Sequence, residues 1–552
     1  MRILVTDPIA EAGLDRLRDA GHEVSIDYDI EGGSALEDAL SGVCGLIVRS
    51  GTDVTRSVFD SADELVIVGR AGIGVDNIDI DAATEHGVIV ANAPEGNVRA
   101  AAEHTVAMTF AAARSIPQAH TRLKAGDWAK SDFLGTEVNN KTLGIVGLGR
   151  VGQEVAKRLQ SLGMDLVAYD PYISEDRADQ IGAELVEFED CLERADFLTV
   201  HTPLTPETED LISHDELAKL EGGYLINCAR GGVVDEPALA EAVSEGVLKG
   251  AALDVFADEP ISSENPLLDV EDVIVTPHLG ASTEAAQENV ATSTAEQVLA
   301  AFNDEPVLNA LNAPSVDKSA FPRVRPYIEL AETAGRIAAQ LFDERVESVD
   351  VRYAGEIAEE EIDLVTASAL KGVFSPLEWQ VNAVNAPQVA EDRGVEVTET
   401  KSHQAENFRS VVTVTVGNGD VSGRDPEASR TSSDAGKTEL GVSGTLFADD
   451  DPRIVRIDDY RVDAIPHGHM LVARNSDQPG VIGFIGTVLG ENDINIAGMF
   501  NAREAIGGEA ITVYDLDEEV SDEVLTRIEE DERIIVARYI TLDGAGAVRT
   551  SL

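Results

Sequence analysis

Short apolar runs alternate with amphipathic stretches along the first 312 residues of this 552-residue chain. Apolar runs bounded by turn residues predict buried strands, and a 3.6-residue period between them predicts helices such as 11–19. The predicted strands are residues 3–6, 23–26, 45–48, 65–68, 88–91, 143–146, 166–169, 197–200, 223–227, 250–255 and 273–276. Regular alternation of strand and helix is typical of parallel sheets with crossover helices. We therefore predict an α/β fold with two doubly wound domains in this region.

Two longer helical patterns and a linker divide the chain further. Residues 100–115 and 284–303 predict helices long enough to cross between the two domains. A Pro-containing segment at 309–314 has the composition of a linker. The sequence alone does not say how the chain passes between the two domains at these crossovers.

The pattern of predicted elements changes at residue 313, and the new pattern continues to residue 465. A helix predicted at 326–341 is followed by strands predicted at 348–353 and 409–416, which indicates an α+β domain. Residues 417–436 are polar and rich in turn formers, so we predict a long exposed loop there, with disorder as an alternative.

The segment 466–552 has a third pattern. It predicts strands at 470–474, 494–501, 509–516 and 534–540, and helices at 481–491 and 522–531. The resulting order, βαββαβ, is the ferredoxin-like arrangement. We therefore expect a small α+β domain at the end of the chain.

Acidic residues dominate the charge of the chain. Asp and Glu total 102 against 42 Lys and Arg, which gives a formal net charge of −60. Nucleic acids and anionic membranes require a basic footprint, so the charge excludes both as partners. Self-repulsion of this size destabilises a compact chain in dilute buffer, whereas molar salt shortens the Debye length to about 3 Å. The composition thus resembles that of proteins from salt-accumulating halophiles; an acidic enzyme without that adaptation is the alternative.

The three cysteines, Cys44, Cys191 and Cys228, lie in apolar or helical contexts without C-x-x-C spacing. A sparse, odd set of cysteines is typical of a reducing compartment without a disulfide framework. The N-terminal residues predict a strand and not a signal peptide, and no apolar run reaches the roughly 18 residues of a membrane span. We therefore expect a cytoplasmic protein, and we predict no metal site.

The strongest local signal is a glycine-rich turn after the strand that begins at Leu143. Gly147, Gly149 and Gly152 form G-x-G-x-x-G between this strand and a predicted helix, and Asp170 ends the next strand. The first glycine permits a tight turn, the second admits a pyrophosphate and the third lets the helix pack on the strand. The helix N-terminus attracts phosphates, and the acid binds ribose hydroxyls while repelling a 2′-phosphate. The pattern therefore predicts a Rossmann-like domain that binds NAD.

Three polar side chains follow later strands of the same predicted sheet, namely Arg230, Glu259 and His278. The carboxyl ends of parallel strands meet at one edge, where ligands bind. Oxidation of a 2-hydroxy acid needs a base for the hydroxyl proton and a cation for the carboxylate. Histidine titrates near neutrality, a carboxylate orients its ring, and a guanidinium grips a carboxylate. We predict His278 and Glu259 as the acid–base pair and Arg230 as the substrate clamp, although each residue alone would more often be structural.

Together these motifs resemble the D-isomer-specific 2-hydroxyacid dehydrogenase family over residues 1 to about 312. Segments 201–208, 227–232 and 258–260 match the family nearly letter for letter. Beyond the glycines, the resemblance implies cofactor contacts at Arg150, Val151, Asp170, Thr202, Cys228, Ala229, Asp254, Gly280 and Ala281. It also implies a discontinuous first domain, in which residues 1–97 and 285–312 bind substrate while 98–284 bind NAD.

Four residues of the first domain point to a phosphorylated substrate. Arg49, Ser50 and Arg70 lie in motifs that match the amino-terminal domain of one branch of the family, and Asn97 matches a substrate-side asparagine there. Both arginines follow strand ends, and two fixed cations suit a phosphate better than a short apolar 2-hydroxy acid. The alternative is that either arginine pairs with one of the many nearby acids.

The rest of the chain resembles regulatory parts of the longest family members. Residues 313–465, with Val381–Pro387, resemble an intervening domain, and 466–552 resemble an ACT domain, a module that binds amino acids. By motif position Asn475, Asp477 and Asn495 would hold an amino-acid effector, since acid and amide groups suit an ammonium and a carboxylate. An ACT fold used only for assembly is the alternative.

We therefore expect an NAD-dependent dehydrogenase that oxidises a small anionic, phosphorylated 2-hydroxy acid and forms a homodimer or homotetramer. An enzyme for an unphosphorylated 2-hydroxy acid is one alternative. A non-enzymatic NAD-sensing scaffold on the same fold is another, because such a protein can retain the three catalytic residues.

Overall fold

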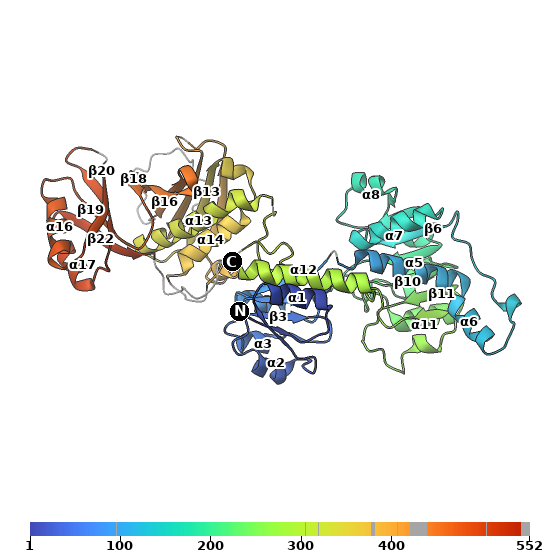
Figure 1. Cartoon of the computed structure of the whole chain (residues 1–552). Coiled ribbons are helices and arrows are strands. Elements are labelled where there is room, and N and C mark those ends of the chain that lie inside the picture. Colours follow the sequence, from blue (N-terminus) through green and yellow to red (C-terminus); the bar gives the residue numbers. More distant parts are fainter. Residues whose placement is uncertain are drawn as a thin grey trace.

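The computed structural model describes residues 1–94, 96–303, 305–317, 319–376, 381–405, 407–419, 439–503 and 505–542. Figure 1 shows two lobes connected by one long helix, and a C-terminal part that forms a further pair of sheets. The sheets of the described residues hold five, seven, six and four strands in chain order. These sheets confirm the predicted α/β fold class and the ferredoxin-like order of the last sheet.

The first lobe is a parallel sheet in the order β2-β1-β3-β4-β5. Its elements are β1 (Arg2–Val5), α1 (Glu11–Asp19), β2 (Glu23–Ile26), α2 (Gly33–Ala39), β3 (Gly45–Val48), α3 (Arg56–Asp60), β4 (Ile67–Arg70), α4 (Ile80–Glu85) and β5 (Ile89–Asn92). All residues of β3 and β5 are buried, as in parallel sheets covered on both faces. The strand predicted at 65–68 runs instead from Ile67 to Arg70, because these are the residues that pair with β3.

Helix α12 (Glu284–Phe302) returns from the second lobe and covers the first sheet (Figure 1). The Thr283 hydroxyl caps its start by accepting a hydrogen bond from Ala286 N. Close packing depends on glycines, since a Cβ on Gly69 of β4 would lie 2.7 Å from the Thr294 side chain. The first sheet is therefore completed by a helix that comes much later in the chain.

The second lobe is a parallel sheet in the order β12-β11-β10-β9-β6-β7-β8. Its elements are α5 (Val98–Arg114), α6 (Ile116–Lys124), η1 (Lys130–Asp132), β6 (Thr142–Val146), α7 (Arg150–Ser161), β7 (Asp165–Tyr169), α8 (Glu175–Ile181), β8 (Glu184–Leu185), α9 (Phe188–Arg194), β9 (Phe197–Val200), α10 (His214–Lys219), β10 (Tyr224–Asn227), α11 (Glu236–Ser244), β11 (Gly250–Leu253), η2 (Pro266–Asp269) and β12 (Val273–Val275). The strand order reverses between β6 and β9, and such a switch point opens a crevice at the carboxyl ends of the strands.

The middle part of the chain forms a mixed sheet in the order β14-β13-β15-β16-β17-β18. Its elements are α13 (Phe321–Leu341), β13 (Ser348–Gly355), η3 (Glu356–Glu359), α14 (Asp363–Phe374), α15 (Ala386–Asp392), β14 (Glu396–Ser402), β15 (Ser410–Gly417), β16 (Glu439–Leu446), η4 (Ala448–Asp450), β17 (Pro452–Ile457) and β18 (Tyr460–Ala464). Helix α13 begins five residues before the predicted start, because Pro326 is accommodated in its second turn. The loop predicted at 417–436 lies outside the described residues from 420 onward.

The last part forms an antiparallel sheet in the order β20-β21-β19-β22. Its elements are β19 (His469–Ser476), α16 (Val481–Glu491), β20 (Ile496–Arg503), β21 (Glu509–Leu516), α17 (Asp522–Glu529) and β22 (Ile534–Thr541). One sheet face packs under α16 and α17, and residues of the other face, such as Val472 and Val513, join the core of the middle part. In the described part of the chain, no helix is long and apolar enough to cross a membrane.

Two asparagines fasten the middle part to the first lobe. Asn382 donates from Nδ2 to the Gly87 carbonyl at 2.7 Å, and its Oδ1 accepts from Val384 N at 2.9 Å. Asn385 is 3% exposed, and its Oδ1 accepts from Asn382 N at 2.8 Å. Val384 itself joins the hydrophobic core of the first lobe. The loop before α15 thus couples the two parts of the molecule.

Asn382→Ala is expected to loosen this attachment, because it leaves the Gly87 carbonyl and nearby amides without partners at a cost of about 1–3 kcal/mol. Limited proteolysis of the connection between the two parts should then be faster by roughly 5- to 100-fold when opening precedes cleavage. Gln388→Ala, on the exposed side of α15, is the matched control and should leave the rate unchanged. Equal rates for parent and Asn382→Ala would show that the contact does not couple the two parts.

Candidate active site

The glycine turn between β6 and α7 has the form that the motif requires. Gly147 has φ 93°, and a Cβ on Gly152 would collide with the Gly147 carbonyl. A Cβ on Gly149 would meet nothing within 4 Å, so open space faces the turn where a pyrophosphate would approach. Arg150 and Val151 begin α7, so their amides belong to its N-terminus.

Asp170 stands beside this turn at the end of β7. Its Oδ2 accepts a hydrogen bond from Leu148 N at 2.8 Å, and its Oδ1 accepts from Tyr172 N at 2.9 Å. Thr202, after β9, lies against the turn, since a Cβ on Gly147 would lie 3.1 Å from its Cγ2; its hydroxyl is buried and has no hydrogen-bond partner among the described residues. An orphaned hydroxyl next to an open glycine turn fits a polar ligand such as NAD.

Cys228 and Ala229 follow β10 on the same edge of the sheet. Burial, and then the charge of Asp254, raise the pKa of the Cys228 thiol to about 12. The thiol is therefore neutral, and Cys228 acts as a small apolar side chain in the wall of the crevice. Ala229 N donates to Asn227 Oδ1 at 3.0 Å, which fixes the turn that leads to Arg230.

His278 and Glu259 form a direct pair. His278 Nδ1 lies 2.6 Å from Glu259 Oε2, so this nitrogen donates and Nε2 remains free toward solvent. Burial raises the pKa of Glu259, but the hydrogen bond from His278, the charge of its ring and the hydrogen bond from Phe256 N together outweigh burial and leave the pKa below its usual range. The carboxylate therefore stays ionised and can stabilise an imidazolium.

Arg230 extends from the second lobe to the first. Its Nε lies 3.4 Å from Asp76 Oδ2, and its side chain fills the space that a Cβ on Gly74 would need. Its Nη1 donates to the Ala229 carbonyl at 2.7 Å. The three predicted catalytic residues thus come from three strand-end loops of the second sheet, and Arg230 meets the first lobe there.

A pocket between the lobes contains most of the predicted substrate residues. Its lining includes Arg49, Arg70 and Asn97 together with Ala281 of the cofactor side. The pKa of Arg70 is lowered to about 10 by burial and by the neighbouring charges of Arg230 and Arg49. Three guanidinium groups that repel one another mark a site that an anion would stabilise.

The alternative pairing of Arg49 and Arg70 with nearby acids is not found. Among the described residues neither side chain forms an ion pair, and Arg70 Nε is buried without a partner. Asp7 accepts a hydrogen bond from the backbone N of Arg49, and the Arg49 side chain reaches only the Pro8 carbonyl. Ser50 is exposed at the end of β3 and does not line the pocket.

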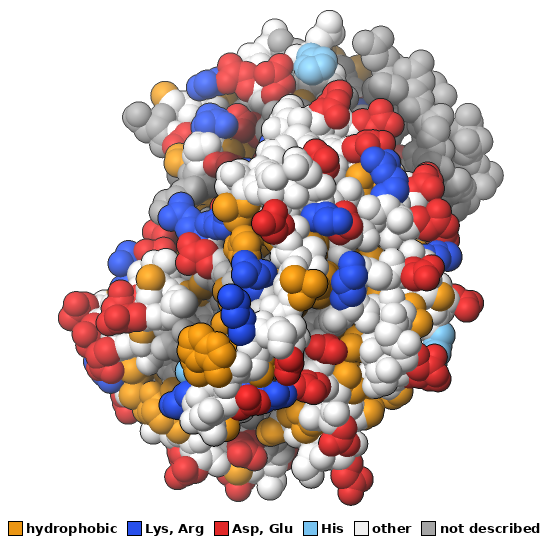
Figure 2. Space-filling view, turned by 90° about the vertical axis from the view of Figure 1, so that its right-hand side faces the viewer, with side chains coloured by type: hydrophobic (Ala, Val, Ile, Leu, Met, Phe, Trp, Pro, Cys, Tyr) orange, Lys and Arg blue, Asp and Glu red, His pale blue; other side chains and the backbone are white. Residues whose placement is uncertain are grey.

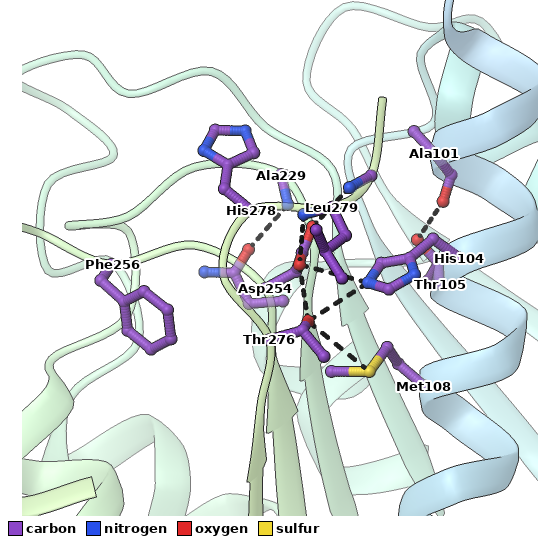
Figure 3. Close-up of polar contacts among 12 residues, drawn as sticks. Ala101, His104, Thr105, Met108, Ala229, Asp254, Phe256, Thr276, His278 and Leu279 are labelled. Carbon is purple, nitrogen blue, oxygen red and sulfur yellow. Dashed lines mark hydrogen bonds and ion pairs between the residues drawn. The ribbon is translucent and has the colours of Figure 1, made fainter. Parts of the chain in front are cut away.

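Asp254, a cofactor contact that the resemblance implies, is buried directly after β11. Its carboxylate accepts hydrogen bonds from Leu279 N and Gly280 N, both at 2.7 Å. Figure 3 shows that His104 of α5 joins this network, a residue that the sequence patterns did not single out. Gln287 of α12 lines the pocket and was likewise not singled out by the sequence patterns.

The three residues predicted to bind an effector do not meet within one chain. Asn475 is 3% exposed with an unpartnered Oδ1, and it lies opposite Ala510 on β21. Asp477 accepts hydrogen bonds from Gly507 N and Arg503, which lower the pKa of its carboxyl. Asn495 instead precedes Ile496, which pairs with Leu516 at the other end of β21. At about 3.4 Å per residue, Leu516 lies roughly 20 Å along the strand from Ala510, the partner of Asn475.

In the described part of the chain, no group of three or more His, Cys, Asp or Glu is arranged to hold a metal ion.

Comparisons with known proteins show which families the chain resembles. Residues 106–280 match the family described as D-isomer specific 2-hydroxyacid dehydrogenase, NAD binding domain, and residues 323–424 match the D-3-phosphoglycerate dehydrogenase intervening domain. The crystal structure of TT0316 protein from Thermus thermophilus has a TM-score of 0.53, is 34% identical, and covers 56% of this chain and 100% of its own. NAD-dependent formate dehydrogenase from Staphylococcus aureus, in complex with NAD, has a TM-score of 0.51 at 30% identity, covering 55% of this chain and 97% of its own.

Full-length relatives are closer in sequence. D-3-phosphoglycerate dehydrogenase of Archaeoglobus fulgidus is 41% identical over 98% of this chain and 100% of its own length. The enzyme of the same name from Bacillus subtilis is 41% identical over 98% of this chain and 99% of its own. These matches confirm the predicted NAD-binding oxidoreductase, and the chain belongs to the D-3-phosphoglycerate dehydrogenases within the D-isomer-specific 2-hydroxyacid dehydrogenase family.

Proposed function

We propose that the protein oxidises 3-phospho-D-glycerate (3-phosphoglycerate) to 3-phosphohydroxypyruvate with NAD, the first step of L-serine biosynthesis. One observation carries the proposal: Arg49, Arg70 and Arg230 converge beside a pocket that also reaches the cofactor side at Ala281. A substrate with a carboxylate at one end and a phosphate at the other supplies an anionic partner for Arg49 and Arg70, which form no ion pair in the described structure. Its second anionic group can meet Arg230, which Asp76 approaches at 3.4 Å.

In this proposal His278 takes the proton of the 2-hydroxyl through its free Nε2, while Glu259 holds Nδ1–H and the ring orientation. Arg230 grips the substrate carboxylate with its planar fork. NAD, when bound, supplies the acceptor for the hydride that leaves C2. Arg49 and Arg70 bind the phosphate, and the free amide of Asn97 orients the substrate between them.

We propose that the chain has four domains. Residues 1–97 and 285–312 form the substrate-binding domain, 98–284 the NAD-binding domain, 313–465 the intervening domain and 466–552 the ACT domain. The division is supported by α12, which packs on the first sheet although it follows the second. Three free thiols, at Cys44, Cys191 and Cys228, support a reducing, cytoplasmic location.

The test is NADH absorbance with 3-phosphoglycerate, D-glycerate and D-2-hydroxyglutarate, each in about 3 M KCl so that screening is nearly complete. The proposal expects preference for the phosphorylated acid by about 100-fold or more in kcat/KM, as two charge-assisted contacts would provide. Preference for an unphosphorylated acid would overturn the substrate and keep the dehydrogenase. No turnover with any of the three acids, together with NAD binding, would favour a non-enzymatic NAD sensor.

We propose L-serine as the effector, bound where two copies of the ACT domain meet. Asn475 and Asn495 lie at opposite ends of one sheet, so a site that uses both amides requires a second chain. Serine titration of activity at several protein concentrations tests this idea. Inhibition that weakens as the protein is diluted supports it, and inhibition independent of dilution contradicts it.

Association of two or four chains has a candidate surface around α6. Figure 2 views this end of the NAD-binding lobe, where basic side chains lie next to hydrophobic ones near the middle and acidic ones gather at the margins. Trp128 is 78% exposed and Leu134 is 97% exposed, beside Arg122 and Lys124 on α6. Arg122 pairs with Asp127 and Asp132 of its own chain, so the exposed apolar side chains, and not a free positive charge, make this surface suited to contact a second copy. Sedimentation of Trp128→Ser tests this surface, since it should shift the protein toward the monomer.

Activity is expected to require high salt, because a chain of net charge −60 repels both itself and an anionic substrate. We predict that kcat/KM falls at least about tenfold between 3 M and 0.1 M KCl, where the Debye length grows from under 3 Å to about 10 Å. Circular dichroism in the same buffers separates unfolding from poor encounter with the substrate. Equal activity in both buffers would refute the halophilic adaptation.

A further inference from the structure

Asp254 lies at the centre of the hydrogen-bond network drawn in Figure 3. Its side chain is fully buried and accepts from Thr276 Oγ1 at 2.6 Å, Leu279 N at 2.7 Å and Gly280 N at 2.7 Å. Its backbone carbonyl also accepts from His278 N at 2.9 Å. One residue therefore holds the backbone of the whole segment that carries His278.

The segment that carries His278 has an unfavourable backbone conformation that other contacts must stabilise. His278 has φ 52°, in the left-handed region that costs an ordinary residue roughly 1–2 kcal/mol. The two amides that follow it both donate to the Asp254 carboxylate, which stabilises the turn. The direction in which the imidazole leaves the backbone, toward Glu259, depends on this conformation. Asp254 thus orients the acid–base pair without a hydrogen bond to either side chain.

A buried carboxylate requires donors of its own to remain charged. His104 provides one from α5: its Nε2 lies 3.2 Å from Asp254 Oδ1 and 3.3 Å from Thr276 Oγ1. Burial raises the pKa of Asp254, but hydrogen bonds from His104, Thr276 and Leu279 outweigh it and leave the pKa below its usual range. A charged carboxylate binds the two backbone amides more strongly than a neutral one.

We propose that His104 is a positioning residue for the reaction, which fixes Asp254 and through it the left-handed turn at His278. Helix α5 begins directly after Asn97 of the substrate pocket, so the same helix contacts both the substrate side and the catalytic turn. The inference rests on the proposed dehydrogenase function, because its readout is the oxidation of 3-phosphoglycerate.

Two substitutions separate the hydrogen bond from the space that His104 fills. His104→Leu removes the donor, whereas His104→Gln retains an N–H at the reach of Nε2. In about 3 M KCl we expect kcat to fall roughly 10- to 100-fold in the Leu variant, as for a misplaced catalytic group, with the NAD dissociation constant changed less than about threefold. The Gln variant should recover to within about fivefold of the parent. Deuterium at C2 of the substrate should slow kcat more in the Leu variant than in the parent, because hydride transfer becomes more rate-limiting.

His214→Leu makes the same chemical change on exposed α10 and should leave kcat, NAD binding and the isotope effect unchanged. Parent-like kcat in His104→Leu overturns the proposal, as does an equal loss in the Leu and Gln variants. If the Leu variant does not fold, His104→Asn replaces it, since its shorter amide does not reach Asp254. If the parent oxidises an acid other than 3-phosphoglycerate, the proposed function fails and the same variants are compared on that acid.

Discussion

His278→Ala should lower kcat by about 10²–10⁴-fold, the usual contribution of a positioned acid–base group, while NAD still binds. The free Nε2 has no substitute in the described structure, because Glu259 faces the other ring nitrogen at 2.6 Å. The left-handed backbone at residue 278 adds a structural effect, since histidine is enriched at positive φ among residues other than glycine and alanine is not. Steady-state rates together with calorimetric NAD titration measure both effects.

Glu259→Gln is the companion variant. It keeps the shape of the side chain and loses the charge that stabilises an imidazolium, so we expect a smaller loss of roughly 10- to 100-fold. Full activity in His278→Ala would remove the acid–base assignment. Loss of NAD binding together with activity would instead indicate that the turn, and not the imidazole, carries the effect.

Arg70→Leu should change which acid the enzyme prefers. One charge-assisted contact to phosphate contributes about 1.5–3 kcal/mol, so kcat/KM for 3-phosphoglycerate should fall about 10- to 150-fold. The value for D-glycerate should change little, because that substrate has no phosphate to lose. Removal of the Arg70 guanidinium also removes its repulsion by the charges of Arg230 and Arg49, so the melting temperature should not fall as it would for a core residue.

Arg18→Leu is a matched control in the same lobe, since Arg18 forms only exposed ion pairs on α1. Such pairs contribute about 0–1 kcal/mol, and both substrates should be oxidised as by the parent. An equal decrease for 3-phosphoglycerate and D-glycerate in Arg70→Leu would place Arg70 at the carboxylate, or in the frame of the pocket, and not at the phosphate.

The nucleotide motif could be predicted because its physical requirements are local. Gly147, Gly149, Gly152 and Asp170 lie within one strand–helix–strand unit, and the structure fastens Asp170 to the turn through Leu148 N. The order of elements was equally accessible, since apolar runs define buried strands. The exact ends of the strands could not be predicted as well. β4 extends to Arg70 because it pairs with β3, and the apolar pattern does not show which residues pair.

Other parts of the site depend on contacts between distant segments. Gln287 reaches the pocket only because α12 returns to the first sheet, and Asp76 meets Arg230 only where the lobes approach. His104 is a polar residue in an alanine-rich helix. This is a weak sequence signal, and it does not identify Asp254 as the partner of the histidine. The separation of Asn475 from Asn495 follows from strand register, which the effector motif does not encode.

Helix α12 also determines the order in which the lobes can mature during synthesis. The face of β4 that packs on Thr294 has no cover until residue 302 has left the ribosome. The second lobe, from α5 to β12, is continuous in sequence and can close before that point. A nascent chain paused after β12 would therefore carry a finished nucleotide lobe and an open first sheet, the kind of exposed apolar surface on which chaperones act.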